Sequence, residues 1–314
     1  MSGRHRLVIA VVVTCLLATA ACRDAGGGPG VEVLATFGFD EGAQPTALAQ
    51  LADGRLVIGE RRTGRILAVP PAVPSAEPQL LATVDVDPDA TGQRGLLGLA
   101  AIEDTLFASW TRGTDGRLVV GRVAPGPVAV VWEGPSSTEL ANGGHLAVAP
   151  DGRLVIGIGD LQQPDLVVDP STLNGKVLSL DPEGPSGQRP LVLSGGWNNP
   201  FALTVAGGTI WVADNAPGRR PERIGRSEVG TAPVELPGRR APSALVALGP
   251  TRLGLCGFLD GDLVAVDVSG RPTVGDTLAR HVCRTGAVAL ASGSVAVSDG
   301  RTVRVLRLRL RPGR

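Results

Sequence analysis

The chain has 314 residues, and its 30 basic and 30 acidic side chains leave a formal net charge of zero at pH 7. That balance gives no electrostatic reason to expect a nucleic acid as the partner, or a membrane held by surface charge. Gly occurs 44 times and Pro 25 times, while 43% of the residues are hydrophobic. Such a mixture favours short strands joined by tight turns over a disordered chain.

Residues 1–21 have the features of a lipoprotein signal peptide. Arg4 and Arg6 give a basic start, and residues 7–17 form an apolar run that is too short to cross a bilayer. Small residues then precede Cys22, as in a bacterial lipobox; a plain secretory signal is the alternative interpretation. We therefore expect lipidation of Cys22, a flexible tether over residues 22–30, and an exported protein anchored to the cell membrane on its extracytoplasmic side.

Two cysteines remain for the mature domain. Cys256 and Cys283 are an even pair in a chain that we expect to be exported, and this favours a disulfide between them. Two buried thiols are the alternative.

An internal repeat organises the residues after the tether. Each copy has an apolar strand, a tight turn and a second apolar strand, and the copies begin at residues 46, 95, 144, 201, 243 and 285. Further strands are expected at 65–69, 118–123, 176–180, 263–268 and 303–310. A loose repeat of this length predicts an all-β, six-bladed β-propeller over residues 31–314.

The two ends of this domain have separate roles in the expected ring. Residues 31–39 are available to complete the last blade. The Arg-rich end, residues 303–311, alternates cationic and aliphatic side chains with one slip at Val305 and Leu306. We interpret it as an outer strand whose charges discourage pairing with another chain.

Propeller geometry predicts a polar rim. The first strand of each blade lines the central channel, so the residues before first strands and after second strands share one end of the ring. The residues expected there are Gln44, Glu60, Gln93, Arg94, Ala141, Asn142, Asp160, Asn198, Asn199, Asp214, Asn215, Arg240, Cys256, Cys283, Arg284 and Asp299. Convergent polar groups of this kind favour a binding site, although solvated loops are polar in any case.

Several stretches in order along the chain carry a resemblance. They are GERRTGRI at 59–66, GQRGLLGLA at 92–100, NGGHL with PDG and GD between 142 and 160, LNGKVLSLDP at 173–182, and NNP at 198–200. Together they resemble the soluble quinoprotein glucose/sorbosone dehydrogenases. The resemblance implies a six-bladed propeller that oxidises aldose sugars with pyrroloquinoline quinone (PQQ) and calcium.

The resemblance also implies roles for single residues. Gln93 and Asp160 match catalytic positions of the family, and His145 is a candidate for a relocated base. Three further residues are candidates for contact with the cofactor, and two for the calcium loop. The cofactor residues are Asn198, Asn199 and Arg94, and the metal residues are Asp214 and Pro217.

Some family positions are substituted. The family's base histidine falls on Ala141, its cofactor arginine falls on Asn198, and the only lysine, Lys176, belongs to a structural motif. The sequence therefore favours a depleted site over an active quinone-dependent dehydrogenase. Two alternatives are a non-catalytic cell-surface propeller that binds a carbohydrate or a protein partner, and a metal-dependent lactonase using Glu60, Asn199 and Asp214. The expected partners are a small sugar or a surface partner, with no nucleic acid, and with the membrane reached only through the lipid anchor.

Overall fold

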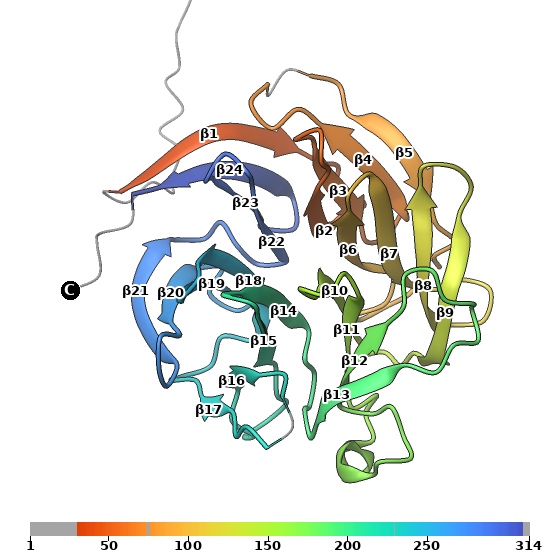
Figure 1. The fold of residues 1–314 in the computed structure, drawn as a ribbon. Coiled ribbons are helices and arrows are strands. Elements are labelled where there is room, and N and C mark those ends of the chain that lie inside the picture. Colours follow the sequence, from red (N-terminus) through yellow and green to blue (C-terminus); the bar gives the residue numbers. More distant parts are fainter. Residues whose placement is uncertain (1–29, 74–75, 229, 310–314) are drawn as a thin grey trace, which may run out of the picture.

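Six four-stranded antiparallel sheets form a ring of blades around a central channel (Figure 1). The computed structural model describes residues 30–309 apart from 74–75 and 229. The expected signal peptide, the lipidation site Cys22 and the tether up to residue 29 lie outside the described residues. The all-β, six-bladed propeller expected from the repeat is confirmed.

The first three blades contain twelve strands and follow one another directly along the chain. Blade 1 consists of β2 (Pro45–Gln50), β3 (Leu56–Glu60), β4 (Arg65–Val69) and β5 (Gln79–Thr83); blade 2 of β6 (Leu96–Ile102), β7 (Thr105–Thr111), β8 (Arg117–Ala124) and β9 (Ala129–Ser136); blade 3 of β10 (Gly143–Val148), β11 (Leu154–Ile158), β12 (Lys176–Leu180) and β13 (Leu191–Gly195). A short 3₁₀ helix, Pro164–Val168, interrupts blade 3 between its second and third strands.

The other three blades complete the ring. Blade 4 consists of β14 (Ala202–Ala206), β15 (Thr209–Asp214), β16 (Arg223–Arg226) and β17 (Val234–Glu235); blade 5 of β18 (Pro242–Gly249), β19 (Arg252–Gly257), β20 (Leu263–Asp267) and β21 (Thr273–Ala279); blade 6 of β22 (Gly286–Ala289), β23 (Val295–Ser298), β24 (Thr302–Leu308) and β1 (Val31–Gly38). No helix within the described ranges is long and apolar enough to cross a membrane.

The ring is closed by a strand from the start of the chain. β1 pairs antiparallel with β24, with Val31 opposite Leu308 and Gly38 opposite Thr302, so residues 31–39 complete the last blade as expected. The register shifts between Val33 and Ala35, which lie opposite Leu306 and Val305. The extra residue of this β-bulge is Leu34 of β1, and it lies opposite the two residues of the slip in β24.

The interpretation of the Arg-rich end as an outer strand is wrong. β24 lies between β23 and β1, and the outermost strand of blade 6 is β1 (Figure 1). Two of the β24 arginines form ion pairs and do not flank an unpaired sheet edge. Arg304 lies 2.6 Å from Asp299, and Arg307 lies 2.8 Å from Glu32 of the neighbouring strand β1. The alternating pattern of β24 does not mark an outer strand, because β1 from the other end of the chain pairs with its outer edge.

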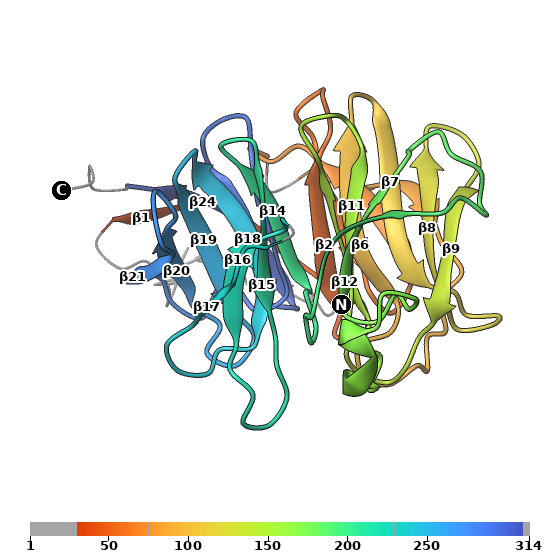
Figure 2. The same cartoon turned by 60° about the horizontal axis from the view of Figure 1, so that its bottom comes forward.

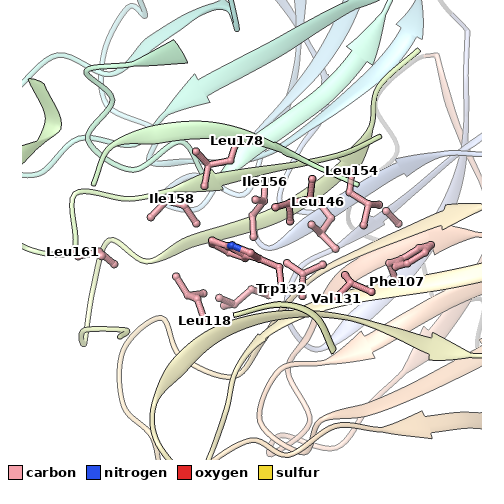
Figure 3. Close-up of a cluster of buried hydrophobic side chains, with 14 residues drawn as sticks. Phe107, Leu118, Val131, Trp132, Leu146, Leu154, Ile156, Ile158, Leu161 and Leu178 are labelled. Atoms are coloured by element: carbon pink, nitrogen blue, oxygen red, sulfur yellow. The ribbon is translucent and has the colours of Figure 1, made fainter. Parts of the chain in front are cut away.

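The hydrophobic core lies between neighbouring blades. Figure 3 shows one such layer, in which Trp132 and Phe107 of blade 2 pack with Ile156 and Leu178 of blade 3, all at most 2% exposed. The inner strands also approach each other closely: a Cβ at Gly98 of β6 would lie 2.6 Å from the carbonyl oxygen of Gly144, so this position requires glycine. Figure 2 shows the blades side-on, with the loops gathered at the two ends of the channel.

The expected disulfide is present. Cys256 at the end of β19 is joined to Cys283 in the segment that leads to β22, with a Cα–Cα distance of 5.2 Å. Both residues are completely buried, in a cluster that includes Val282 and Val297. The bond therefore links blade 5 to the connection into blade 6.

Removing this disulfide should lower stability. The Cys256→Ala/Cys283→Ala double variant should lose about 3 kcal/mol of unfolding free energy, because the sequence separation of 27 residues closes a long loop in the unfolded chain. Urea denaturation of the variant and of the oxidised protein measures the loss. A reductant should destabilise only the parent protein, and a variant as stable as the parent would contradict a structural role for the bond.

Candidate functional site

A cavity of about 650 Å³ lies at the end of the channel where the inner strands β2, β6, β14 and β18 begin. We call it the mouth cavity. Its lining residues are Gln44, Thr46, Arg61, Gly92, Gln93, Leu97, Asn199, Phe201, Asn215, Ala241, Pro242, Ser243, Phe258, His281, Arg284, Thr285, Asp299, Gly300 and Arg301. The structure thus brings six members of the expected polar rim onto one wall: Gln44, Gln93, Asn199, Asn215, Arg284 and Asp299.

Backbone strain is concentrated around this cavity. Gln44 (φ 52°), Ala241 (φ 51°) and His281 (φ 56°) line it, and Ala141 (φ 57°) lies in the corresponding segment before β10. Left-handed φ values are uncommon in residues other than glycine and are retained where the surrounding structure enforces them. Such clusters occur preferentially at active sites and ligand-binding sites.

Gln93 joins three blades at the rim. Its Oε1 atom accepts hydrogen bonds from the Ala141 backbone N–H (2.8 Å) and from Asn199 Nδ2 (3.3 Å). Asn199 in turn accepts the backbone N–H of Gly143 at 2.9 Å. The segments before β6, β10 and β14 are therefore held in one fixed arrangement, while Gln93 Nε2 has no partner within the described part of the chain.

The carboxylate of Asp214 fixes the segment that carries Asn199. Asp214 is fully buried at the end of β15, and it accepts the backbone N–H groups of Asn198 (2.9 Å) and Asn199 (2.7 Å). It also accepts Asn198 Nδ2 at 2.9 Å and forms an ion pair with Arg223 at 2.5 Å. A buried charge of this kind is stable only when it is paired and hydrogen-bonded as here.

The comparisons with known proteins identify the family. The model of the glucose/sorbosone dehydrogenase family matches residues 43–220, more than half of the chain. The chain belongs to the glucose/sorbosone dehydrogenase family. Its match covers blades 1–3 and the first half of blade 4, including the whole Gln93–Asn199–Asp214 network.

Solved structures give the same architecture. A putative oxidoreductase (glucose dehydrogenase) from Thermus thermophilus has a TM-score of 0.72 at 26% identity, with 88% of this chain and 99% of that chain covered. The PQQ-bound aldose sugar dehydrogenase from Streptomyces coelicolor scores 0.71 at 21% identity, covering 90% and 98%. The apo-form aldose sugar dehydrogenase from Escherichia coli scores 0.70 at 21%, covering 90% and 99%. No curated protein sequence matches the chain significantly.

Of the residues matched to the family's catalytic positions, only Gln93 lines the mouth cavity. Asp160 is 3% exposed and lies outside its wall. Asp160 contacts the rim through its backbone N–H, which donates to the Asn198 carbonyl at 2.5 Å. Burial raises the pKa of the Asp160 carboxyl, against a hydrogen bond from the Gln162 backbone N–H and the charge of Arg220.

His145 faces another part of the channel. It lies in β10 and lines a second cavity of about 360 Å³ together with apolar residues of all six inner strands. Its ring meets Phe201 edge-on, with the ring centroids 6.0 Å apart. Burial lowers the pKa of His145 to about 4, so the imidazole is neutral at pH 7.

The residues expected to contact the cofactor do not share a free surface. The Asn198 side chain is held by Asp214 and by Arg220 (3.0 Å), and the Asn199 side chain is held by Gln93 and Gly143. Arg94 lines a separate depression with Asp87, Arg112 and Asp115. The structure therefore does not bring Arg94 together with the two asparagines.

The donor set at the expected calcium loop does not fit a calcium ion. Both carboxylate oxygens of Asp214 are occupied by protein donors, and an ion bound there would have to displace Arg223. Pro217 is exposed, and its carbonyl accepts the backbone N–H of Arg220. Across the described ranges, no three His, Cys, Asp or Glu side chains gather to hold a metal ion.

The lactonase set is also divided. Glu60 lies at the end of β3 in blade 1, and Asp214 lies at the end of β15 in blade 4, on the opposite side of the ring. Glu60 is buried against Thr63 and Arg65 of its own blade. The two carboxylates therefore cannot bind one ion together with Asn199.

The wall residues that were not expected from the sequence include one aromatic and two basic side chains. Arg61, Phe258 and His281 line the mouth cavity, although only Glu60, the neighbour of Arg61, was assigned to the rim. The rim position of two of them could have been predicted from the sequence, because Arg61 directly follows β3 and Phe258 directly follows β19, both second strands of a blade.

Replacing Asp214 should unfold the rim. The Asp214→Ala variant should lose about 3–5 kcal/mol of unfolding free energy, because it leaves Arg223 and two backbone N–H groups without their acceptor. Glu32→Ala removes an exposed ion pair and should cost less than about 1 kcal/mol. Chemical denaturation compares them, and equal losses would contradict the organising role of Asp214.

The raised pKa of Asp160 predicts that removing this carboxylate stabilises the protein at pH 7, whereas removing the carboxylate of Asp214 destabilises it. The folded protein holds this proton to a higher pH than the unfolded chain, so stability decreases as the pH rises through that interval and the deficit persists at pH 7. Asp160→Asn should therefore be more stable than the parent protein at pH 7, with the difference shrinking towards pH 4. In Asp267, where hydrogen bonds from Ser269 lower the pKa, the same change should reduce stability. Urea denaturation at several pH values measures both, and a destabilised Asp160→Asn variant would contradict the assignment.

Proposed function

We propose that the mouth cavity binds a small hydroxyl-rich ligand at the cell surface, and that the protein does not oxidise this ligand by the quinone-dependent route of its family. The observation that carries the proposal is the environment of position 141. The resemblance assigns a proton-accepting histidine there, and this chain has Ala141, whose side chain cannot accept a proton and whose backbone N–H donates to Gln93.

His145 is a poor replacement for that base. A general base is most effective when its pKa lies near the working pH, and the pKa of His145 is about 4. It also lines the second cavity, away from the mouth wall that carries Gln93 and Asn199. Loss of a positioned base typically costs roughly 10²–10⁴-fold in rate.

The cofactor contacts point in the same direction. PQQ carries several carboxylates, which are normally bound by cationic side chains. Asn198 is uncharged and its amide is engaged with Asp214 and Arg220, while Arg94 lines another depression. Asp214 is saturated by protein donors. None of these groups supports quinone or calcium binding at the positions that the resemblance assigns.

The wall of the cavity suits a sugar. Gln93 and Asn215 supply amide groups for hydroxyls, and Leu97 and Phe201 supply apolar surface for the C–H face of a ring. The lipobox ending at Cys22 supports a lipid-anchored protein that meets this ligand outside the cell.

Titration with PQQ and calcium tests the loss of the family chemistry. The purified protein should show no saturable binding at ~100 μM PQQ, and no reduction of a redox dye in the presence of aldoses. The PQQ-binding aldose sugar dehydrogenase from Streptomyces coelicolor is the positive control, and circular dichroism establishes that the protein is folded. Sugar-dependent dye reduction would overturn the proposal.

A further inference from the structure

Two arginines that line the mouth cavity have no carboxylate partner among the described residues. Arg61 donates from Nε and Nη2 to Gln44 Oε1, and from Nη1 to the carbonyl oxygens of Gly92 and Arg94. All of these acceptors are neutral. Burial lowers the pKa of Arg61, and the neighbouring charge of Arg62 adds to this, so the cation is held at a site that does not compensate its charge.

Arg284 is held in place with donors to spare. Its Nη1 atom donates to the carbonyl of Phe258 at 3.0 Å, while Nε and Nη2 have no partner in the described part of the chain. Gly261 lies directly against it, since a Cβ there would be 3.0 Å from Arg284 Nε. The guanidinium group is therefore positioned by the blade 5 loop and can still bind an anion through two nitrogen atoms.

The two cations line the cavity from either side of blades 6 and 1. Arg61 of blade 1 donates to the Gly92 carbonyl before β6, and Arg284 before β22 donates to the Phe258 carbonyl of the blade 5 loop. The other charges on the wall are already paired: Asp299 with Arg304 at 2.6 Å, and Arg301 with Glu41 at 2.5 Å. The two arginines thus leave the lining of the cavity with a net positive charge.

The remaining wall is suited to a carbohydrate ring. The Asn215 side chain makes no hydrogen bond within the described ranges, and Gln93 Nε2 is also without a partner there. Phe258, beside Arg284, is 52% exposed and offers an aromatic face at the entrance. Amides bind hydroxyl groups, and an exposed aromatic ring packs against the C–H face of a sugar.

We infer that the mouth cavity takes a sugar acid, such as a uronic acid, whose carboxylate is bound by Arg284 in a cavity that Arg61 also lines. The hydroxyl groups then face Gln93 and Asn215, and the ring packs against Phe258. This inference rests on the proposed binding function and specifies the ligand class of the same cavity.

Calorimetric titration of the full chain with D-glucuronate and D-glucose tests the inference. D-glucuronate should bind about tenfold or more tightly than D-glucose, because a charge-assisted hydrogen bond is stronger than a neutral one. Arg284→Met should lower the affinity for D-glucuronate about tenfold and so remove this preference. Arg271→Met is the matched control, because Arg271 is exposed on the turn between β20 and β21, at the far end of blade 5, and should change neither affinity.

Each contrary outcome is informative. Equal affinities for the two sugars, or an unchanged preference in the Arg284→Met variant, would overturn the sugar acid while leaving sugar binding at the mouth intact. Inhibition of D-glucuronate binding by equimolar sulfate would show an anion site without sugar recognition and would also overturn it. Failure of both sugars to bind the folded protein would overturn the inference together with mouth binding, whereas PQQ-dependent dye reduction would overturn only the claim of lost oxidation chemistry.

Discussion

The buried carboxylate of Asp214 determines the geometry of the mouth. Because it accepts the backbone N–H groups of Asn198 and Asn199 and is neutralised by Arg223, the segment before β14 cannot move independently of blade 4. That segment places the Asn199 amide on Gln93, and the network extends from there into blades 2 and 3. This part of the polar rim, across blades 2, 3 and 4, is therefore a connected structure that contains a buried charge.

The blades and the rim have separate physical roles. The blades are stabilised by apolar layers between neighbouring sheets and by ring closure through β1, and neither depends on the identity of the rim residues. Rim residues can therefore differ between members of a family while the fold persists. The mouth cavity is lined by amides, by aromatic surface and by two arginines that have no carboxylate partner among the described residues. Such groups are suited to binding a polar ligand.

Much of the fold could be predicted from the sequence because its signals are local. Turns such as Asp53–Gly54 marked the repeat, and residues 31–39 had the pattern of a missing strand. The rim was predicted less well, because the direction of a side chain in an irregular loop is set by tertiary contacts. Arg94 follows the same sequence rule as Gln93 and yet lines a different depression, so adjacent residues were assigned to one site that they do not share.

We propose that the mouth cavity, and not a quinone centre, is the ligand site of this protein. A crystal structure of the purified protein soaked with D-glucuronate tests it most directly. We expect the sugar in the mouth cavity, with its carboxylate bound by Arg284 and its hydroxyl groups hydrogen-bonded to Gln93 and Asn215. A sugar bound elsewhere on the ring, with the mouth cavity holding only solvent, would show that the mouth cavity is not the ligand site.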